Sequence, residues 1–151
     1  MSALFISFRH DDARSETRRI YDRLCKEIGK DHIFFAHESL PVGIDWRRSL
    51  DDALARCKVM VAIIGNRWHN SPDHSLHNPD DFVRYELTAA LAKNIPVLPI
   101  LVDEAQLPRD VELPEELRRL TSFQALKLER SSTRASLEKL IAAVCEFLPS
   151  V

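Results

Sequence analysis

Short apolar runs alternate five times with longer amphipathic segments, and this alternation limits the fold more than any other feature of the chain. The clearest run, VMVAII at residues 59–64, is unbroken and rich in β-branched residues, as is typical of a strand buried on both faces. Similar runs at residues 4–8, 32–35, 97–102 and 123–128 predict four more strands. Because strands alternate with helices, the sequence predicts a parallel sheet with helices on both faces.

Most of the predicted helices carry a signal at one end. Gly29 is placed to end the first helix, and Asp12 stands where its side chain could cap the start. Asp45 is expected to cap the second helix, and Asp80 or Asp81 to start the third. Right-handed crossovers then favour an α/β, flavodoxin-like, three-layer fold with five parallel strands in the order 2-1-3-4-5.

The last third of the chain gives weaker signals. Pro99 interrupts the run at 97–102, where proline removes a donor from the ladder. Residues 113–120 predict a short helix, and an apolar stripe from Leu137 to Leu148 predicts the last one.

Composition limits the ligands more than the fold. The 151 residues form one domain's worth of chain. With only three glycines, the chain has no G-x-G-x-x-G motif and no Walker-type phosphate loop. A net charge of −2 gives no sign of a nucleic-acid partner.

Three cysteines, Cys25, Cys57 and Cys145, lie within predicted helices and form no C-x-x-C motif. We expect buried free thiols in a reducing compartment. The first strand pattern begins near Ala3, which leaves no room for a secretion signal, and no run approaches the ~20 apolar residues that span a bilayer. A cytoplasmic protein without a membrane partner is therefore expected.

Glu86 is the most informative polar residue. Phe82 and Val83 precede it by one helical turn, which places the carboxylate at the edge of an apolar stripe. Burial of a carboxylate is unusual. The alternative is an ordinary glutamate on the helix surface, paired with Arg9 or Lys93.

The polar loop at residues 67–80 contains His69, Asp73, His74 and His77. Imidazole and carboxylate groups suit zinc, but their spacing here defines no site. We therefore predict no metal.

Three motifs resemble those of TIR (Toll/interleukin-1 receptor) domains. LFISFR at 4–9 resembles their first-strand box, LPVG at 40–43 the tip of their BB loop, and FVRYE at 82–86 the aromatic-x-x-x-Glu motif of enzymatic members. IIGNRW at 63–68 and VLPILV at 97–102 are similar to bacterial TIR domains.

The resemblance covers nearly the whole chain and implies that residues 1–151 are one TIR domain, a module of a longer protein. It implies cleavage of NAD+ to nicotinamide and ADP-ribose or a cyclic ADP-ribose isomer, in bacterial antiphage immunity or signalling. NAD+ would be the substrate, and no cofactor is needed. It also implies self-association through TIR–TIR contacts, in filaments.

The resemblance assigns roles residue by residue. Glu86 is the implied catalytic carboxylate, Phe82 stacks on the nicotinamide, and Trp46 forms an aromatic wall, with core packing as its alternative role. Further implied substrate contacts come from the pocket floor and the BB loop: Phe8, Arg9, His10, Glu38, Ser39 and Leu40.

The implied assembly residues of the BB loop are Leu40, Pro41, Val42 and Gly43. The chain departs from the family pattern in three places: Phe82 replaces a tryptophan, Ala36 an acidic residue, and His10 an arginine.

One carboxylate suffices for this chemistry, because nicotinamide leaves as a neutral molecule and needs no proton. Arg9 would hold the pyrophosphate.

Two other functions stay open. A non-enzymatic TIR adaptor would use the loop around Pro41 for association alone. A nucleoside deoxyribosyltransferase-like enzyme would share the sheet topology and a catalytic glutamate.

Overall fold

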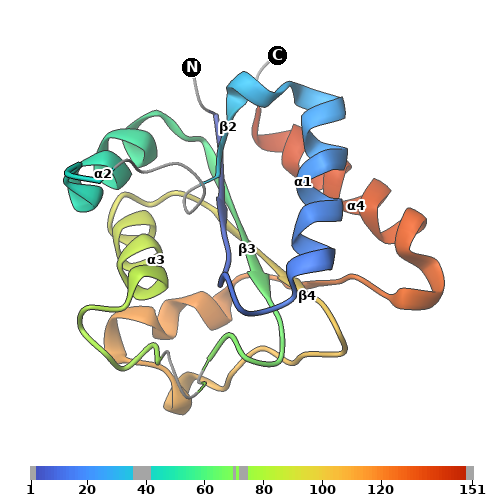
Figure 1. The fold of residues 1–151 in the computed structure, drawn as a ribbon. Helices are drawn as coiled ribbons and strands as arrows, with labels where there is room; N and C mark the ends of the chain where they lie inside the picture. The colour runs from blue at the N-terminus through green and yellow to red at the C-terminus, as the bar shows by residue number, and fades with distance from the viewer. Residues whose placement is uncertain (1–2, 36–41, 70, 72–74, 149–151) are drawn as a thin grey trace.

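A five-stranded parallel sheet forms the centre of the computed structural model, which describes residues 3–35, 42–69, 71 and 75–148 (Figure 1). The strand order is β2-β1-β3-β4-β5, as predicted, and each neighbouring pair is parallel. The strands are β1 (Leu4–Ser7), β2 (Ile33–Phe35), β3 (Val59–Ile64), β4 (Val97–Leu101) and β5 (Leu126–Lys127).

Two α-helices cover each face of this sheet. Figure 1 shows α2 and α3 on one side and α1 and α4 on the other. No described helix is long and apolar enough to cross a membrane. The α-helices are α1 (Arg14–Ile28), α2 (Trp46–Arg56), α3 (Phe82–Ala92) and α4 (Thr133–Phe147).

The helix predicted at 113–120 is a 3₁₀ helix, η3, preceded by a separate 3₁₀ turn, η2. The described part of the chain has four 3₁₀ helices: η1 (Lys30–His32), η2 (Asp110–Glu112), η3 (Glu115–Ser122) and η4 (Arg130–Ser132).

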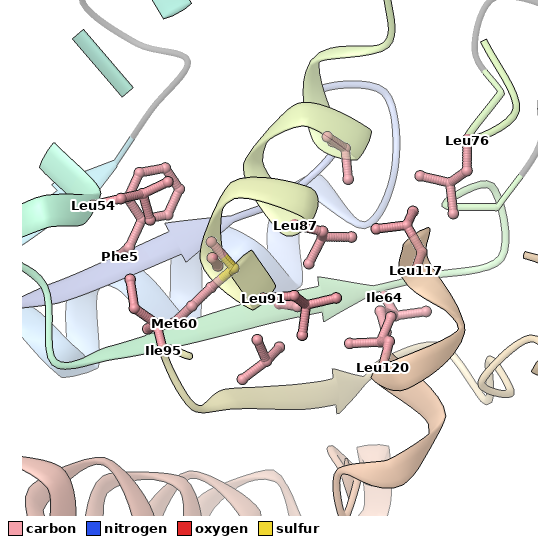
Figure 2. Close-up of a cluster of buried hydrophobic side chains, with 14 of the residues drawn as sticks. Phe5, Leu54, Met60, Ile64, Leu76, Leu87, Leu91, Ile95, Leu117 and Leu120 are labelled. Carbon is pink, nitrogen blue, oxygen red and sulfur yellow. The ribbon is translucent and has the colours of Figure 1, made fainter. Parts of the chain in front are cut away.

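The first apolar core lies between the sheet and the layer of α2, α3 and η3 (Figure 2). Leu87 and Leu91 of α3 and Met60 of β3 belong to this cluster, and Leu117 and Leu120 of η3 complete it. A second core on the other face is built from alternate strand residues together with α1 and α4. Since successive strand side chains point to opposite faces, each strand contributes to both cores.

Pro99 is compatible with β4 because its backbone nitrogen, which lacks a hydrogen, points to a side where no hydrogen bond is needed. The carbonyl of Leu101 accepts a hydrogen bond from the N–H of Leu128, so odd-numbered residues here face β5. Pro99 faces the same side, but pairing with β5 begins only at Ile100, opposite Leu126. The missing N–H of Pro99 therefore lies beyond the end of that ladder.

The predicted ends of three helices are confirmed. Gly29 ends α1 with a positive φ of 92°. Asp45 caps α2 by accepting from the N–H of Arg48 at 3.3 Å, and Asp81 caps α3 by accepting from the N–H of Arg84 at 2.9 Å.

Asp12 does not cap α1 as predicted. The residue before α1 is Ala13, which has a φ of 52° and provides no side-chain cap. Asp12 is buried and accepts from the backbone N–H groups of Gly65 at 3.0 Å and Arg67 at 3.1 Å. It thus ties the loop after β1 to the loop after β3, although burial raises its pKa more than these hydrogen bonds lower it.

The cysteines are free thiols, but they are not uniformly buried as expected. Cys57 is buried, and this burial raises its pKa to about 12. Cys25 is partly exposed, and Cys145 is exposed on α4. The predicted helical positions are confirmed for Cys25 and Cys145, whereas Cys57 follows the last residue of α2.

Gly65→Ala is expected to destabilise the fold by about 2 kcal/mol, because an added Cβ would clash with the carboxylate of Asp12. Urea unfolding of both proteins measures the difference. In an Asp12→Ala background the cost of Gly65→Ala should shrink, since the clashing group is gone. Equal costs in the two backgrounds would contradict the close approach.

Candidate functional site

Glu86 is held at the carboxyl edge of the sheet by β1 and α3. Its side chain is 0% exposed. Oε1 accepts a hydrogen bond from the Ser7 hydroxyl at 2.9 Å, whereas Oε2 has no hydrogen-bond partner among the residues that the structure describes. The alternative of an ordinary helix-surface glutamate is therefore wrong.

The surroundings of Glu86 favour its neutral form. Burial is the main cause, and it raises the pKa of Glu86 well above the ordinary value of 4.5. The negative charge of Asp81 acts in the same direction, while the Ser7 hydrogen bond and the positive charge of Arg9 oppose it. The carboxyl group thus takes up a proton far more readily than an exposed glutamate.

Arg9 forms a buried ion pair with Asp81, the residue that caps α3. Nη1 and Nη2 donate to the two carboxylate oxygens at 2.8 and 2.9 Å, and Nε donates to the carbonyl of Trp68. Only 3% of Arg9 is exposed. The expectation that Arg9 holds a pyrophosphate does not fit this geometry, because each guanidinium nitrogen already binds the protein.

Three aromatic side chains gather where the first turns of α2 and α3 meet, and we call them the aromatic cluster: Trp46, Phe82 and Tyr85. The ring centroid of Trp46 lies 4.8 Å from that of Phe82 and 5.3 Å from that of Tyr85. The guanidinium carbon of Arg47 lies 4.4 Å from the centroid of Trp46. Trp46 is only partly buried, so one of its sides faces outward. The structure thus brings Trp46 and Phe82 together on the Glu86 side of the sheet.

Phe8 and His10 lie on the other side of the sheet. Phe8 is buried in the core formed with α1 and α4, where it stacks on Phe35 at 4.6 Å. His10 is exposed, and with Phe8 it lines a cavity of about 400 Å³ beside Arg14 and Arg18 of α1. Alternation along β1 explains the separation of Ser7 from Phe8, since Ser7 faces Glu86 of α3 and Phe8, directly after the strand, lies in the core with α1 and α4, while His10 lies in the turn that follows. The expected floor beneath Glu86 therefore does not include Phe8 or His10.

Most of the predicted BB-loop residues lie outside the described chain: Glu38, Ser39, Leu40 and Pro41. Val42 and Gly43 are described and exposed. Gly43 has a φ of 91°, a value that residues with a Cβ rarely adopt, and an added Cβ would meet no atom within 4 Å.

The polar loop before α3 is attached to η2 by two of its histidines. Nε2 of His69 and Nε2 of His77 each lie 2.8 Å from the carbonyl oxygen of Glu112. Asp73 and His74 are outside the described residues, and among those described no three metal-ligating side chains gather.

The sequence analysis did not assign a site role to Tyr85 of the aromatic cluster or to two polar residues that act on Glu86, Ser7 and Asp81. Ser7 is the only hydrogen-bonding side chain in the apolar run at 4–8. A lone hydroxyl at the end of a buried strand could have marked Ser7 as a candidate site residue. Asp81 was predicted to start α3, but its pairing with Arg9, 72 positions away, leaves no local trace.

Comparison with known proteins identifies the family. The family model for the TIR domain matches residues 4–141, and the chain belongs to that family. It is similar to the TIR domains of the activated Roq1 resistosome that directly recognises the pathogen effector XopQ, with a TM-score of 0.71 and 13% identity, covering 95% of this chain and 99% of that one.

A second similar structure is a metazoan TIR-STING receptor from C. gigas in complex with 2',3'-cGAMP. The TM-score is 0.62 and the identity 20%, and the match covers 98% of this chain and 40% of that one. No curated protein matches the sequence. At these identities the structural matches establish the shared fold.

Arg9→Ala is expected to cost about 3 kcal/mol or more in unfolding free energy, since it leaves Asp81 buried without its counter-charge. The matched control is Arg23→Ala, which breaks a more exposed pair with Glu27 at 2.7 Å and should cost well under about 1 kcal/mol. Urea denaturation measures both variants. Similar losses in the two would contradict a special role for the buried pair.

Glu86 should also make stability depend on pH. Because its pKa is raised in the folded state, its contribution is fully present below the unfolded-state value near 4.5 and is lost as the pH rises through the folded-state value. Glu86→Gln keeps the neutral shape and should remove this loss. Wild type should therefore weaken relative to Glu86→Gln as the pH rises above the unfolded-state value of about 4.5, by at most about 1.4 kcal/mol per pH unit. If the urea midpoints of wild type and Glu86→Gln changed with pH in the same way, the raised pKa would be contradicted.

Proposed function

We propose that this TIR domain cleaves NAD+ at the bond between nicotinamide and ribose. The observation that carries the proposal is a fully buried glutamate, Glu86, which a serine holds and which lies one helical turn after Phe82 of the aromatic cluster. The TIR family and the aromatic-x-x-x-Glu spacing of Phe82 and Glu86 support the same reaction.

In the proposed reaction, the carboxylate of Glu86 faces C1' of the ribose. The C1'–N bond breaks and its electron pair stays on the nicotinamide nitrogen, so the pyridinium leaves as a neutral molecule. Positive charge develops on the ribose, and the Glu86 carboxylate stabilises it or bonds to C1'. Water then attacks C1' and loses a proton to give ADP-ribose, or a nucleophile within the same molecule attacks to give a cyclic isomer.

The aromatic cluster supplies the apolar side of the site. Phe82 lies one helical turn before Glu86, which suits a ring that stacks on nicotinamide, and Trp46 is the wall behind it. A site of this kind recognises the nicotinamide–ribose end of NAD+ and needs no glycine-rich phosphate loop.

Activity in this proposal depends on self-association. Glu86 has no exposed surface, so substrate reaches it only when the groups that cover it move. Val42, at the tip of the BB loop, is 105% exposed and offers an apolar contact to a neighbouring copy. The similar Roq1 TIR domains belong to an activated resistosome. A head-to-tail contact of this kind propagates as a filament.

The biological setting follows from the same resemblance. NAD+ is the substrate and no separate cofactor takes part. The domain acts in the cytoplasm, as an effector or signal producer in bacterial antiphage immunity, and binds neither nucleic acid nor membrane.

The test is incubation of NAD+ with the purified domain, at high concentration or clustered through a tag on a bead, with products identified by mass spectrometry. Wild type should release nicotinamide, and Glu86→Ala should lower the rate by about a thousandfold, as expected for loss of an electrostatic stabiliser. Arg23→Ala is the surface control and should retain activity. Intact NAD+ with clustered, folded wild type would overturn the proposal.

A second function, a non-enzymatic TIR adaptor, is favoured by the exposure of Val42 and of Ile44, which is 49% exposed. In that case Val42→Asp would abolish self-association, measured by light scattering. Glu86→Ala would leave association intact, and no variant would release nicotinamide.

A further inference from the structure

Ser7 occupies a rigid position opposite Glu86. It is the last residue of β1, its side chain is fully buried, and it pairs with Ala62 of β3, the central strand. Its hydroxyl donates to Oε1 of Glu86 at 2.9 Å. A short side chain on a central strand has little freedom to move, so this hydroxyl is a fixed reference point for the carboxyl group.

Two charged side chains, Arg9 and Asp81, act on Glu86, and they form an ion pair with each other. Arg9 follows β1 and Asp81 caps α3, and these two groups act on Glu86 only through their charges while forming their own bidentate ion pair. Within the described part of the chain, Ser7 supplies the one hydrogen bond to Glu86, and Oε2 is left without a partner. The two oxygens of this carboxyl group are therefore not equivalent.

We infer that Ser7 is a positioning residue that binds Oε1 of Glu86 and thereby presents Oε2 to the ribose. This inference rests on the proposed function and assigns each oxygen of the catalytic carboxyl group a separate task. A carboxylate that rotates freely places its charge at C1' only part of the time, whereas one held at Oε1 is already oriented.

The same hydrogen bond keeps Glu86 ionisable. Burial favours the protonated form, and a protonated carboxyl group neither stabilises a cationic ribose nor bonds to it. A hydroxyl that donates to the carboxylate favours the charged form and opposes burial. Loss of the Ser7 hydroxyl should therefore both misorient the carboxylate and move its titration to higher pH.

The first measurement is the pH profile of kcat for clustered wild type and Ser7→Ala. We expect Ser7→Ala to lower kcat about tenfold or more near neutral pH with little change in KM, and to shift the acidic limb upward by about one pH unit. Ser7→Cys retains a weak donor and should lie between the two. An unshifted acidic limb in Ser7→Ala overturns the inference.

The matched control is Ser136→Ala. Ser136 is also a buried serine in a hydrogen bond, accepting from the N–H of Glu129 at 3.3 Å, but it lies on α4 across the sheet. It should lose similar stability while keeping the wild-type pH profile. A shift of the same size in Ser136→Ala would show that general destabilisation is the cause, and would overturn the inference.

A second measurement does not depend on activity. NMR titration of ¹³C-labelled glutamate carboxyl groups, with Glu86→Gln identifying the resonance, gives the midpoint for Glu86 in the folded domain without substrate. The midpoint should be higher in Ser7→Ala than in wild type, and equal midpoints overturn the inference even if NAD+ is cleaved. If wild type leaves NAD+ intact while the midpoint shifts, the proposed function fails and the link between Ser7 and Glu86 stands.

Discussion

The buried ion pair between Arg9 and Asp81 joins the end of β1 to the start of α3, and the arrangement of the site depends on it. Arg9 lies two residues after Ser7, and Asp81, the N-cap of α3, lies five residues before Glu86. Fixing the two charged groups therefore fixes the strand and helix that carry the hydroxyl and the carboxyl group. The carbonyl of Trp68 binds the same guanidinium, so the loop after β3 is held in register as well.

At Glu86 the protonation state that suits the stability of the fold differs from the one that the proposed chemistry requires. A neutral, buried carboxyl group is compatible with the apolar core that surrounds it, whereas an ionised one has lost its water. The chemistry proposed here needs the ionised form. The Ser7 hydroxyl and the Arg9 charge offset only part of that conflict.

Local patterns predicted the fold well and the site only in part. The run at 59–64 became β3, and Gly29, Asp45 and Asp81 end or begin helices as expected. Asp12 shows the limit, since a residue with good capping chemistry instead accepts from the backbone of Gly65, 53 positions away. Such a contact depends on how two loops far apart in the sequence meet in the folded chain, which no local pattern contains.

The sequence by itself determined the parallel α/β sheet, its strand order and the placement of Glu86 one turn after Phe82, because these follow from periodicity and short-range spacing. Only the tertiary structure decided that Ser7 faces Glu86 and that the guanidinium of Arg9 is paired with Asp81. It also decided that Phe8 lies on the opposite face of the sheet from Glu86. The physical reason is that a strand sends neighbouring side chains to opposite faces, and the partner of each is set by which helix covers that face.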